Sequence, residues 1–213
     1  LSQLPWPKPR MRKEECGDAW FKANEVYCDI STYERDLRLR ILTESAIVGQ
    51  MSTVASLVVG RDGSTSKDKS SNGVSSDADR KAFLTRRRKV DCILIGGNTA
   101  RHEPYKQSPV PLVILSRSTI NPVVGNDLSH LWNMSPADAL AKAKSQFGER
   151  ILVEAGTSII FELIDQGLID QLELSVTPVT GGDNPIDWQG LLNRFENHTH
   201  THVDGTDFYV ARN

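Results

Sequence analysis

From residue 51 onward, short apolar runs alternate with amphipathic stretches, and this alternation limits the possible folds more than any other feature. The runs are too short for helices and are bounded by glycine, proline or charged residues, which predicts strands. They lie at 51–59, 90–95, 112–115, 151–153, 172–179 and 208–211. Helical stretches between them favour a mostly parallel sheet, because parallel strands need a crossover connection. The final two runs predict antiparallel strands, so the fold class is α/β.

Helix boundaries are marked by capping residues. Ser76 and Asp79 form a capping-box variant that predicts a helix to about Lys89. Ser135 followed by proline predicts a helix over 137–147, and a third helix is expected over 156–166. The segment 64–73 is predicted to be a polar loop. The alternation of Leu, Glu and Ser within 172–179 predicts a half-buried strand.

The first fifty residues lack this alternation. Prolines around Trp6 predict irregular structure over 1–30, and Ser31-Thr32 could cap a helix through about Ile47. Nothing resembles a linker, so we expect an N-terminal extension over 1–50 and one domain over 51–213.

Composition excludes several classes of protein. The 213 residues carry a formal net charge of −2, which disfavours binding to a phosphate backbone. No apolar stretch approaches the roughly 20 residues of a membrane span, and residues 1–12 lack the apolar core of a signal peptide. The three cysteines form no CxxC pair. We therefore expect a cytoplasmic protein that binds neither nucleic acid nor membrane.

Three predicted strands end in residues suited to a ligand, and sites in such sheets lie at the carboxyl ends of strands. Two glycines in Ile95–Thr99 would let a ligand approach the backbone, although a simple turn explains them equally well. The hydroxyl and guanidinium of Ser116 and Arg117 suit a phosphate monoester; a polar strand end is the alternative. Small residues at 156–158 open a helix, whose free N–H groups would bind pyrophosphate. Glu154 either caps that helix or hydrogen-bonds a polar ligand.

Other motifs point away from common enzyme classes. The chain has no GxGxxG, Walker A or HExxH sequence. Ser64–Lys67 matches SxxK but lacks the companion motifs of an acyl-enzyme. Three alternating histidines at 198, 200 and 202 would share one face of a strand, and a solvated edge strand is favoured over a metal site. We therefore predict no metal.

Six segments, in this order, resemble the reductase domain of the bifunctional riboflavin-biosynthesis deaminase–reductase. The resemblance runs from about Met51 to Gly182, with the final strand also fitting. The matching residues are 55–57 with 62–63, 74–80, 91–99, 113–117, 153–156, and 168–170 with 177–182. The resemblance implies a dihydrofolate-reductase-like fold, a homodimer and NADPH as cofactor. The implied reaction is hydride reduction of the ribosylamino group of a phosphorylated aminouracil, which needs no protein nucleophile or metal.

The resemblance also assigns residues, without naming a catalytic one. On the cofactor side these are Thr99, Glu103, Ser116, Arg117, Gly156, Thr157 and Ser158. On the substrate side they are Ser71, Arg87 and Glu154.

Two departures from the family pattern keep other functions open. The usual Ser-Leu-Asp-Gly is spread over Ser56–Gly63. The segment Glu103-Pro104-Tyr105-Lys106 stands where the family often has Asp-Pro-x-Leu followed by a basic residue. The family's deaminase zinc motif is absent. One alternative is a reductase of the same fold acting on a pterin or another small substrate. The other is a non-catalytic ligand-binding paralogue, which the altered Asp62-Gly63 motif would fit.

Overall fold

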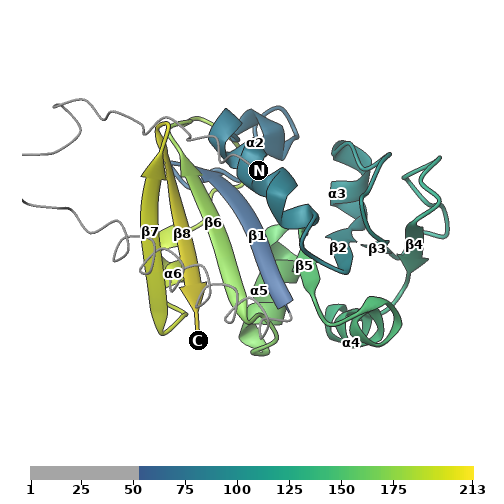
Figure 1. The fold of residues 1–213 in the computed structure, drawn as a ribbon. Helices are drawn as coiled ribbons and strands as arrows, with labels where there is room; N and C mark the ends of the chain where they lie inside the picture. The colour runs from purple at the N-terminus through teal and green to yellow at the C-terminus, as the bar shows by residue number, and fades with distance from the viewer. Residues whose placement is uncertain (1–52) are drawn as a thin grey trace, which may run out of the picture. The chain divides into compact units, whose positions relative to one another are not determined.

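The computed structural model describes residues 53–213, which form one eight-stranded mixed sheet with helices on both faces (Figure 1). The predicted features of residues 1–50 lie outside the described residues. The strand order is β4-β3-β2-β5-β1-β6-β8-β7. All pairings among β1 to β6 are parallel, and β8 and β7 add antiparallel strands at one edge. The predicted α/β class and mostly parallel sheet are confirmed.

The strands and α-helices follow the predicted order with three additions, and the segment predicted as a polar loop contains the 3₁₀ turn η2. The strands are β1 (Thr53–Gly60), β2 (Cys92–Gly96), β3 (Leu112–Leu115), β4 (Ser129–Trp132), β5 (Ile151–Val153), β6 (Gln171–Thr177), β7 (Asn197–Val203) and β8 (Thr206–Arg212). The helices are η2 (Ser71–Gly73), α2 (Asp77–Arg87), α3 (Gly97–His102), α4 (Pro136–Phe147), α5 (Thr157–Asp165) and α6 (Trp188–Leu192). The predictions lacked β4, α3 and α6.

The predicted caps are present. The Ser76 hydroxyl accepts a hydrogen bond from the Asp79 backbone N–H at 3.1 Å and begins α2. Ser135 does the same for Asp138 at the start of α4, with Pro136 in the first turn. Because a cap satisfies a backbone N–H that the helix itself leaves free, each fixes where its helix begins.

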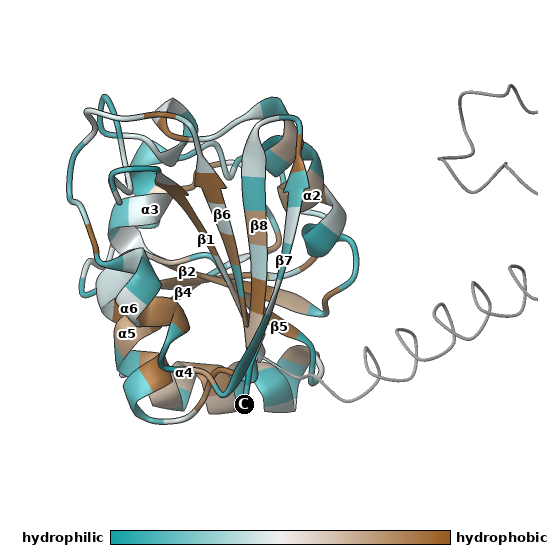
Figure 2. Ribbon diagram, turned by 90° about the vertical axis from the view of Figure 1, so that its left-hand side faces the viewer, coloured by the Kyte–Doolittle hydropathy of each residue, from teal (hydrophilic) through white to brown (hydrophobic). Residues whose placement is uncertain are grey.

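One face of the sheet is covered by α4, α5 and α6, and it holds the larger core cluster. Fully buried side chains from the strands, such as Leu94 and Leu174, pack there with Leu140 of α4 and Leu163 of α5. Figure 2 shows apolar colour along the strands and on α5 and α4, while β7 is mostly hydrophilic.

The opposite face is shared by α2 and α3, which cover different halves of it. Under α3 the core is apolar and includes Ile93, Ile114 and Leu152. Under α2 it is polar: Arg86 pairs with Glu173 and also donates to the hydroxyl of Ser56 at 3.0 Å. This face of the sheet therefore has an apolar half under α3 and a polar half under α2.

The strand predicted over 172–179 is present as β6, which ends at Thr177, but the prediction that it is half-buried is wrong. Ser175 and Thr177, on the face expected to meet solvent, are 0% and 1% exposed. The Thr177 hydroxyl donates to the carbonyl of Val74, just before α2, at 2.6 Å. The strand therefore lies inside the sheet with both faces covered. Its leucine and valine side chains face the apolar core, and its alternating polar side chains face the buried polar layer. The edge strand predicted for the histidines is confirmed, since every residue of β7 is exposed.

Candidate functional site

A cleft of about 820 Å³ opens at the carboxyl edge of the sheet, between α2 and α3. Its walls come from the ends of β2 and β5, the middle of β1, and the polar segment 64–73. The central position of β5 explains this location. The chain passes from β1 to β2 across the gap that β5 later fills, so the crossovers leave in different directions there. Such a switch point is where α/β sheets bind ligands.

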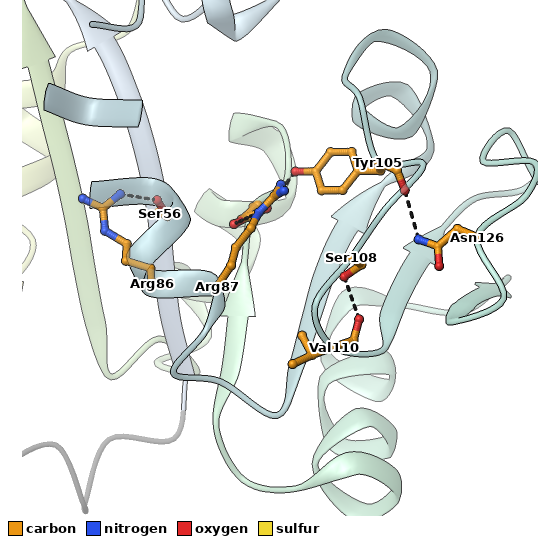
Figure 3. A network of polar contacts seen from close by, with 8 residues as sticks. Ser56, Arg86, Arg87, Tyr105, Ser108, Val110 and Asn126 are labelled. Atoms are coloured by element: carbon orange, nitrogen blue, oxygen red, sulfur yellow. Dashed lines mark hydrogen bonds and ion pairs between the residues drawn. The ribbon is translucent and has the colours of Figure 1, made fainter. Parts of the chain in front are cut away.

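Three side chains from distant parts of the chain converge on the inner wall of the cleft (Figure 3). Arg87, at the end of α2, binds both carboxylate oxygens of Glu154: its Nε lies 2.9 and 3.0 Å from Oε1 and Oε2, and Nη2 lies 2.6 Å from Oε2. The Tyr105 hydroxyl donates to the same Oε2 at 2.8 Å. The Arg87 and Glu154 side chains are only 9% and 3% exposed. We call these three residues the inner triad.

Aromatic rings enclose the guanidinium of the inner triad. The Arg87 Cζ atom lies 4.1 Å from the ring centre of Phe83 and 4.6 Å from that of Tyr105, both suited to cation–π attraction. Burial by itself would lower the pKa of Arg87, but the hydrogen bonds and negative charge of Glu154, together with the contribution of Tyr105, outweigh burial and raise the pKa. Burial, together with the charge of Glu154, raises the pKa of Tyr105 well above its usual value. Arg87 and Tyr105 therefore both keep their protons near neutral pH.

The segment 64–73 runs along the mouth of the cleft and is held on both sides. On one side, the backbone N–H groups of Thr65 and Ser66 donate to the Asp183 carbonyl at 3.1 and 3.4 Å. On the other, the Glu103 carboxylate accepts from the Ser71 N–H at 2.7 Å and from the Ser70 hydroxyl at 3.1 Å. Glu103, predicted on the cofactor side, thus also anchors this loop across the cleft.

Two helices begin at the cleft, each after a central strand. Gly97 starts α3 after β2, and an ideal Cβ there would lie 2.8 Å from the Ser116 Oγ, so the residue must be glycine for α3 to pack on β3. Gly156 precedes α5 with an ordinary φ of −60°, and a Cβ there would meet no atom within 4 Å. The space in front of α5 is therefore open to a ligand, and the helix dipole favours an anion there.

A second hollow of about 330 Å³ adjoins the cleft and shares Gly97 and Asn98 with it. Ser116 and Arg117 line it as predicted, and so does Arg101 of α3. The Arg101 Nη2 donates to the Asn98 Oδ1 at 3.2 Å. Two guanidinium groups and two serine hydroxyls meet here, with Ser118 as the second serine. We call this set the outer rim.

The structure brings the predicted site residues into these two connected hollows. Thr99, Glu103, Gly156, Thr157, Ser158, Ser71, Arg87 and Glu154 line the cleft, and Ser116 and Arg117 line the outer rim. Glu154 does not cap α5, because its carboxylate accepts hydrogen bonds from Arg87 and Tyr105 instead.

Sequence reasoning missed Tyr105, Phe83 and Arg101. Only the spacing of Arg101 could have indicated a role, since it follows Asn98 by one helical turn. The Tyr105 and Phe83 contacts depend on how α2 and α3 are placed by the fold, which no local pattern encodes.

Asp62 and Gly63, the altered motif, lie at the end of β1 but do not line the cleft. Asp62 accepts from the Ser64 hydroxyl at 2.7 Å and from the Gly181 N–H at 2.6 Å. Hydrogen bonding, first of all from Ser64, lowers the pKa of Asp62 to about 2. Gly63 has φ +85°, and a Cβ added there would clash with the Ile186 carbonyl oxygen, so the position leaves no room for a side chain. The motif holds the β1 turn against the segment after β6.

Neither a membrane span nor a metal centre is found in the described part of the chain. Between residues 53 and 213, no helix combines the length and apolar character that a membrane crossing requires. Over the same residues, no three His, Cys, Asp or Glu side chains are grouped as metal ligands would be.

Comparison with known proteins gives one family and several similar structures. The family model described as the RibD C-terminal domain matches residues 50–207, and no curated protein matches the chain. A pyrimidine reductase-like protein from Corynebacterium diphtheriae has a TM-score of 0.57 at 15% identity, covering 76% of this chain and 92% of that one. A putative riboflavin biosynthesis protein from Shewanella sp. PV-4 gives 0.56 at 18%, covering 76% and 99%.

Dihydrofolate reductase from Enterococcus faecalis, complexed with NADP(H), gives a TM-score of 0.55 at 20% identity, covering 76% of this chain and 96% of that one. At these identities the likenesses establish the fold alone, and they confirm the predicted dihydrofolate-reductase-like architecture.

Proposed function

The chain belongs to the RibD C-terminal domain family, and from that premise we propose that it is an NADPH-dependent reductase. We further propose that its substrate is 5-amino-6-(5-phosphoribosylamino)uracil, within riboflavin biosynthesis. The reductase comprises residues 51–213, with residues 1–50 as an N-terminal extension, and it acts as a homodimer.

The observation that carries this proposal is the continuous path from the open start of α5 to the outer rim. Gly156 faces free space, and the α5 backbone N–H groups beyond it suit a pyrophosphate. The adjoining hollow gathers Arg101 and Arg117 with serine hydroxyls, which suits a phosphate monoester. These two anion sites in adjoining hollows match the pyrophosphate and the 2′-phosphate of NADPH, so the residues present fit the cofactor.

When bound, the reduced nicotinamide supplies the hydride, and the protein's task is to place the substrate beside it. We assign Thr99 and Glu103 to the cofactor side of the cleft, and Glu103 also anchors the segment 64–73 at the mouth of the cleft. Ser71, Arg87 and Glu154 belong to the substrate side.

The inner triad suits an uncharged ring, because Arg87 and Glu154 cancel each other's charge. A substrate phosphate needs a cation that is not already neutralised by a carboxylate. Lys69 and Arg80 line the same cleft and meet that need, with Arg80 stacked 5.4 Å from the Phe83 ring centre. The proposal thus places the base near the triad and the phosphate toward α2.

The first test is a calorimetric titration of the purified protein with NADPH and with NADH at fixed salt. We expect tight binding of NADPH and weaker binding of NADH. Loss of NADPH absorbance on adding the aminouracil substrate then tests the reaction. Failure to bind either nucleotide would favour the ligand-binding paralogue, and turnover of a pterin but not of the aminouracil would favour the other reductase.

A valine at position 156 tests the pyrophosphate site. The protein can accommodate the side chain, because φ is −60° and no atom lies near the new Cβ, so we expect Gly156→Val to fold normally. Its side chain would occupy the space in front of α5 and abolish NADPH binding. Unchanged affinity in the folded variant would remove the start of α5 from the site.

A further inference from the structure

Reduction of the opened sugar requires a proton as well as a hydride. The hydride goes to the carbon of the carbon–nitrogen double bond, and the nitrogen must gain a proton for charge to balance. An acid that gives up a proton efficiently near neutral pH serves best. The identity of this proton donor rests on the proposed function, because only that reaction requires one.

Most acidic side chains of the cleft are committed elsewhere. The Tyr105 proton is directed at Glu154, and Glu154 is the ionised partner of Arg87. The Asp79 carboxylate accepts from the Ser75 hydroxyl at 2.6 Å, and Glu103 holds the loop. Lysine and arginine side chains release protons reluctantly near neutral pH, and carboxylates there have none to give.

His102 is the remaining candidate among the described residues that line the cleft. It is the last residue of α3 and is exposed at the cleft wall. Its Nδ1 lies 2.9 Å from the backbone carbonyl oxygen of Asn98. A carbonyl oxygen only accepts hydrogen bonds, so Nδ1 carries a proton and Nε2 is the nitrogen that can exchange one.

Charges of both signs line the same cleft as this imidazole. Arg101 and Glu103 flank it in the chain, and the groups of other elements lining the same cleft are Lys69, Asp79, Arg80, Arg87, Glu154 and Asp183. Arg87 and Glu154 cancel as a buried pair. The charged groups that line the cleft with His102 are therefore not all of one sign.

We propose that His102 is the general acid of the reduction. The imidazolium Nε2–H bond breaks and its proton passes to the imine nitrogen, as the hydride from the reduced nicotinamide forms the new C–H bond. The carbon–nitrogen double bond becomes a single bond, the bound cofactor would be the group that is oxidised, and His102 is left neutral, with its Nδ1–H still donating to the Asn98 carbonyl. Because the side chain is exposed, water reprotonates it before the next turnover.

The kinetic test compares His102→Gln with His198→Gln, an exposed histidine on β7 that does not line the cleft. For His102→Gln we expect kcat to fall about 100-fold or more with unchanged NADPH affinity. The decline of wild-type kcat with rising pH should disappear, and added imidazole should restore part of the rate. His198→Gln should behave as wild type.

Two outcomes would overturn the proposal, and they are distinguishable. If wild-type protein does not reduce the aminouracil substrate, the proposed function fails and the role of His102 fails with it. If wild type is active and His102→Gln keeps its rate and pH profile, only the role of His102 is overturned.

A measurement without substrate tests the geometry. In protein carrying ¹⁵N-labelled histidine, long-range ¹H–¹⁵N spectra distinguish the two neutral tautomers, and His102→Gln identifies the signal. We expect His102 to carry its proton on Nδ1 at high pH. A proton on Nε2 instead would contradict the arrangement from which the proposal starts.

Discussion

The inner triad and the outer rim both contain charged side chains, but those of the triad are buried and paired, whereas Arg117 of the rim is exposed and unpaired among residues 53–213. In the inner triad, a guanidinium, a carboxylate and a phenol satisfy one another in a nearly dry space. In the outer rim, Arg117 is exposed and makes no hydrogen bond or ion pair with residues 53–213. Charged groups that already pair with each other contribute to the structure of the cleft wall. An exposed cation without a partner can instead bind a ligand. We therefore expect the triad to govern stability and the rim to govern affinity.

The largest expected effect is on stability, from removing the charge of Glu154. Glu154→Gln leaves the Arg87 guanidinium buried without a counter-ion and should lower the free energy of unfolding by about 3–5 kcal/mol. Chemical denaturation measures this. The matched control is Arg150→Gln, which breaks the pair of Arg150, 53% exposed, with Asp91 and should cost at most about 1 kcal/mol. Equal losses would show that burial of the triad adds nothing.

The next effect concerns the rim. Arg117→Ala should weaken NADPH binding about 10- to 100-fold, the worth of a hydrogen bond between charged groups, and change NADH binding little. Calorimetry with both nucleotides measures the difference, and Arg61→Ala, an exposed arginine outside both hollows, is the control. A similar loss for both nucleotides would mean that Arg117 does not meet the 2′-phosphate. The variant should unfold like wild type.

A smaller effect is expected from the phenol of the triad. Tyr105→Phe keeps the ring against Arg87 but removes the donor to Glu154, and it should lower the free energy of unfolding by about 1 kcal/mol. Chemical denaturation can resolve this loss. Were it as large as that of Glu154→Gln, the hydroxyl and not the ion pair would hold the triad together.

The smallest effect is expected from Asp62, an exposed carboxylate outside both regions. Its pKa is lowered from 3.8 to about 2 in the folded protein, so it adds stability above pH 4 that is lost as pH falls through about 2. The difference in unfolding free energy between wild type and Asp62→Asn should therefore shrink as pH is lowered from 5 to 2. A difference that does not depend on pH would contradict this hydrogen-bonding account.

Sequence patterns predicted those elements whose determinants are local. Ser76 and Ser135 mark helix starts because a cap acts within three residues, and the buried strands are marked by continuous apolar runs. The strand β4 was missed because its residues, Ser129–Trp132, lie at the sheet edge and only Trp132 is buried. The helix α3 was missed because it begins at a glycine pair and spans six residues.

The site could be predicted only in part, for the same reason. Ser116 and Arg117 of the outer rim and the start of α5 follow strands directly, so they could be predicted from the sequence, whereas Arg101 of the rim lies on α3 and was missed. The inner triad joins Glu154 to residues 67 and 49 positions away in the chain. Such contacts depend on helix placement, and the charge cancellation between two residues predicted to touch substrate emerged only from the structure.

The insertion of β5 between β2 and β1 also has a consequence for biosynthesis. Among residues 53–213, β1 pairs with β5 and β6 alone, so Ala55 cannot form these pairs until Val153 and Leu172 have left the ribosome. Until then the nascent chain carries β1 without a neighbour and β2 with one open edge, both strongly apolar. Contacts of such long sequence separation slow folding. We therefore expect the sheet to assemble late and in one step, with the nascent chain prone to aggregation before that point.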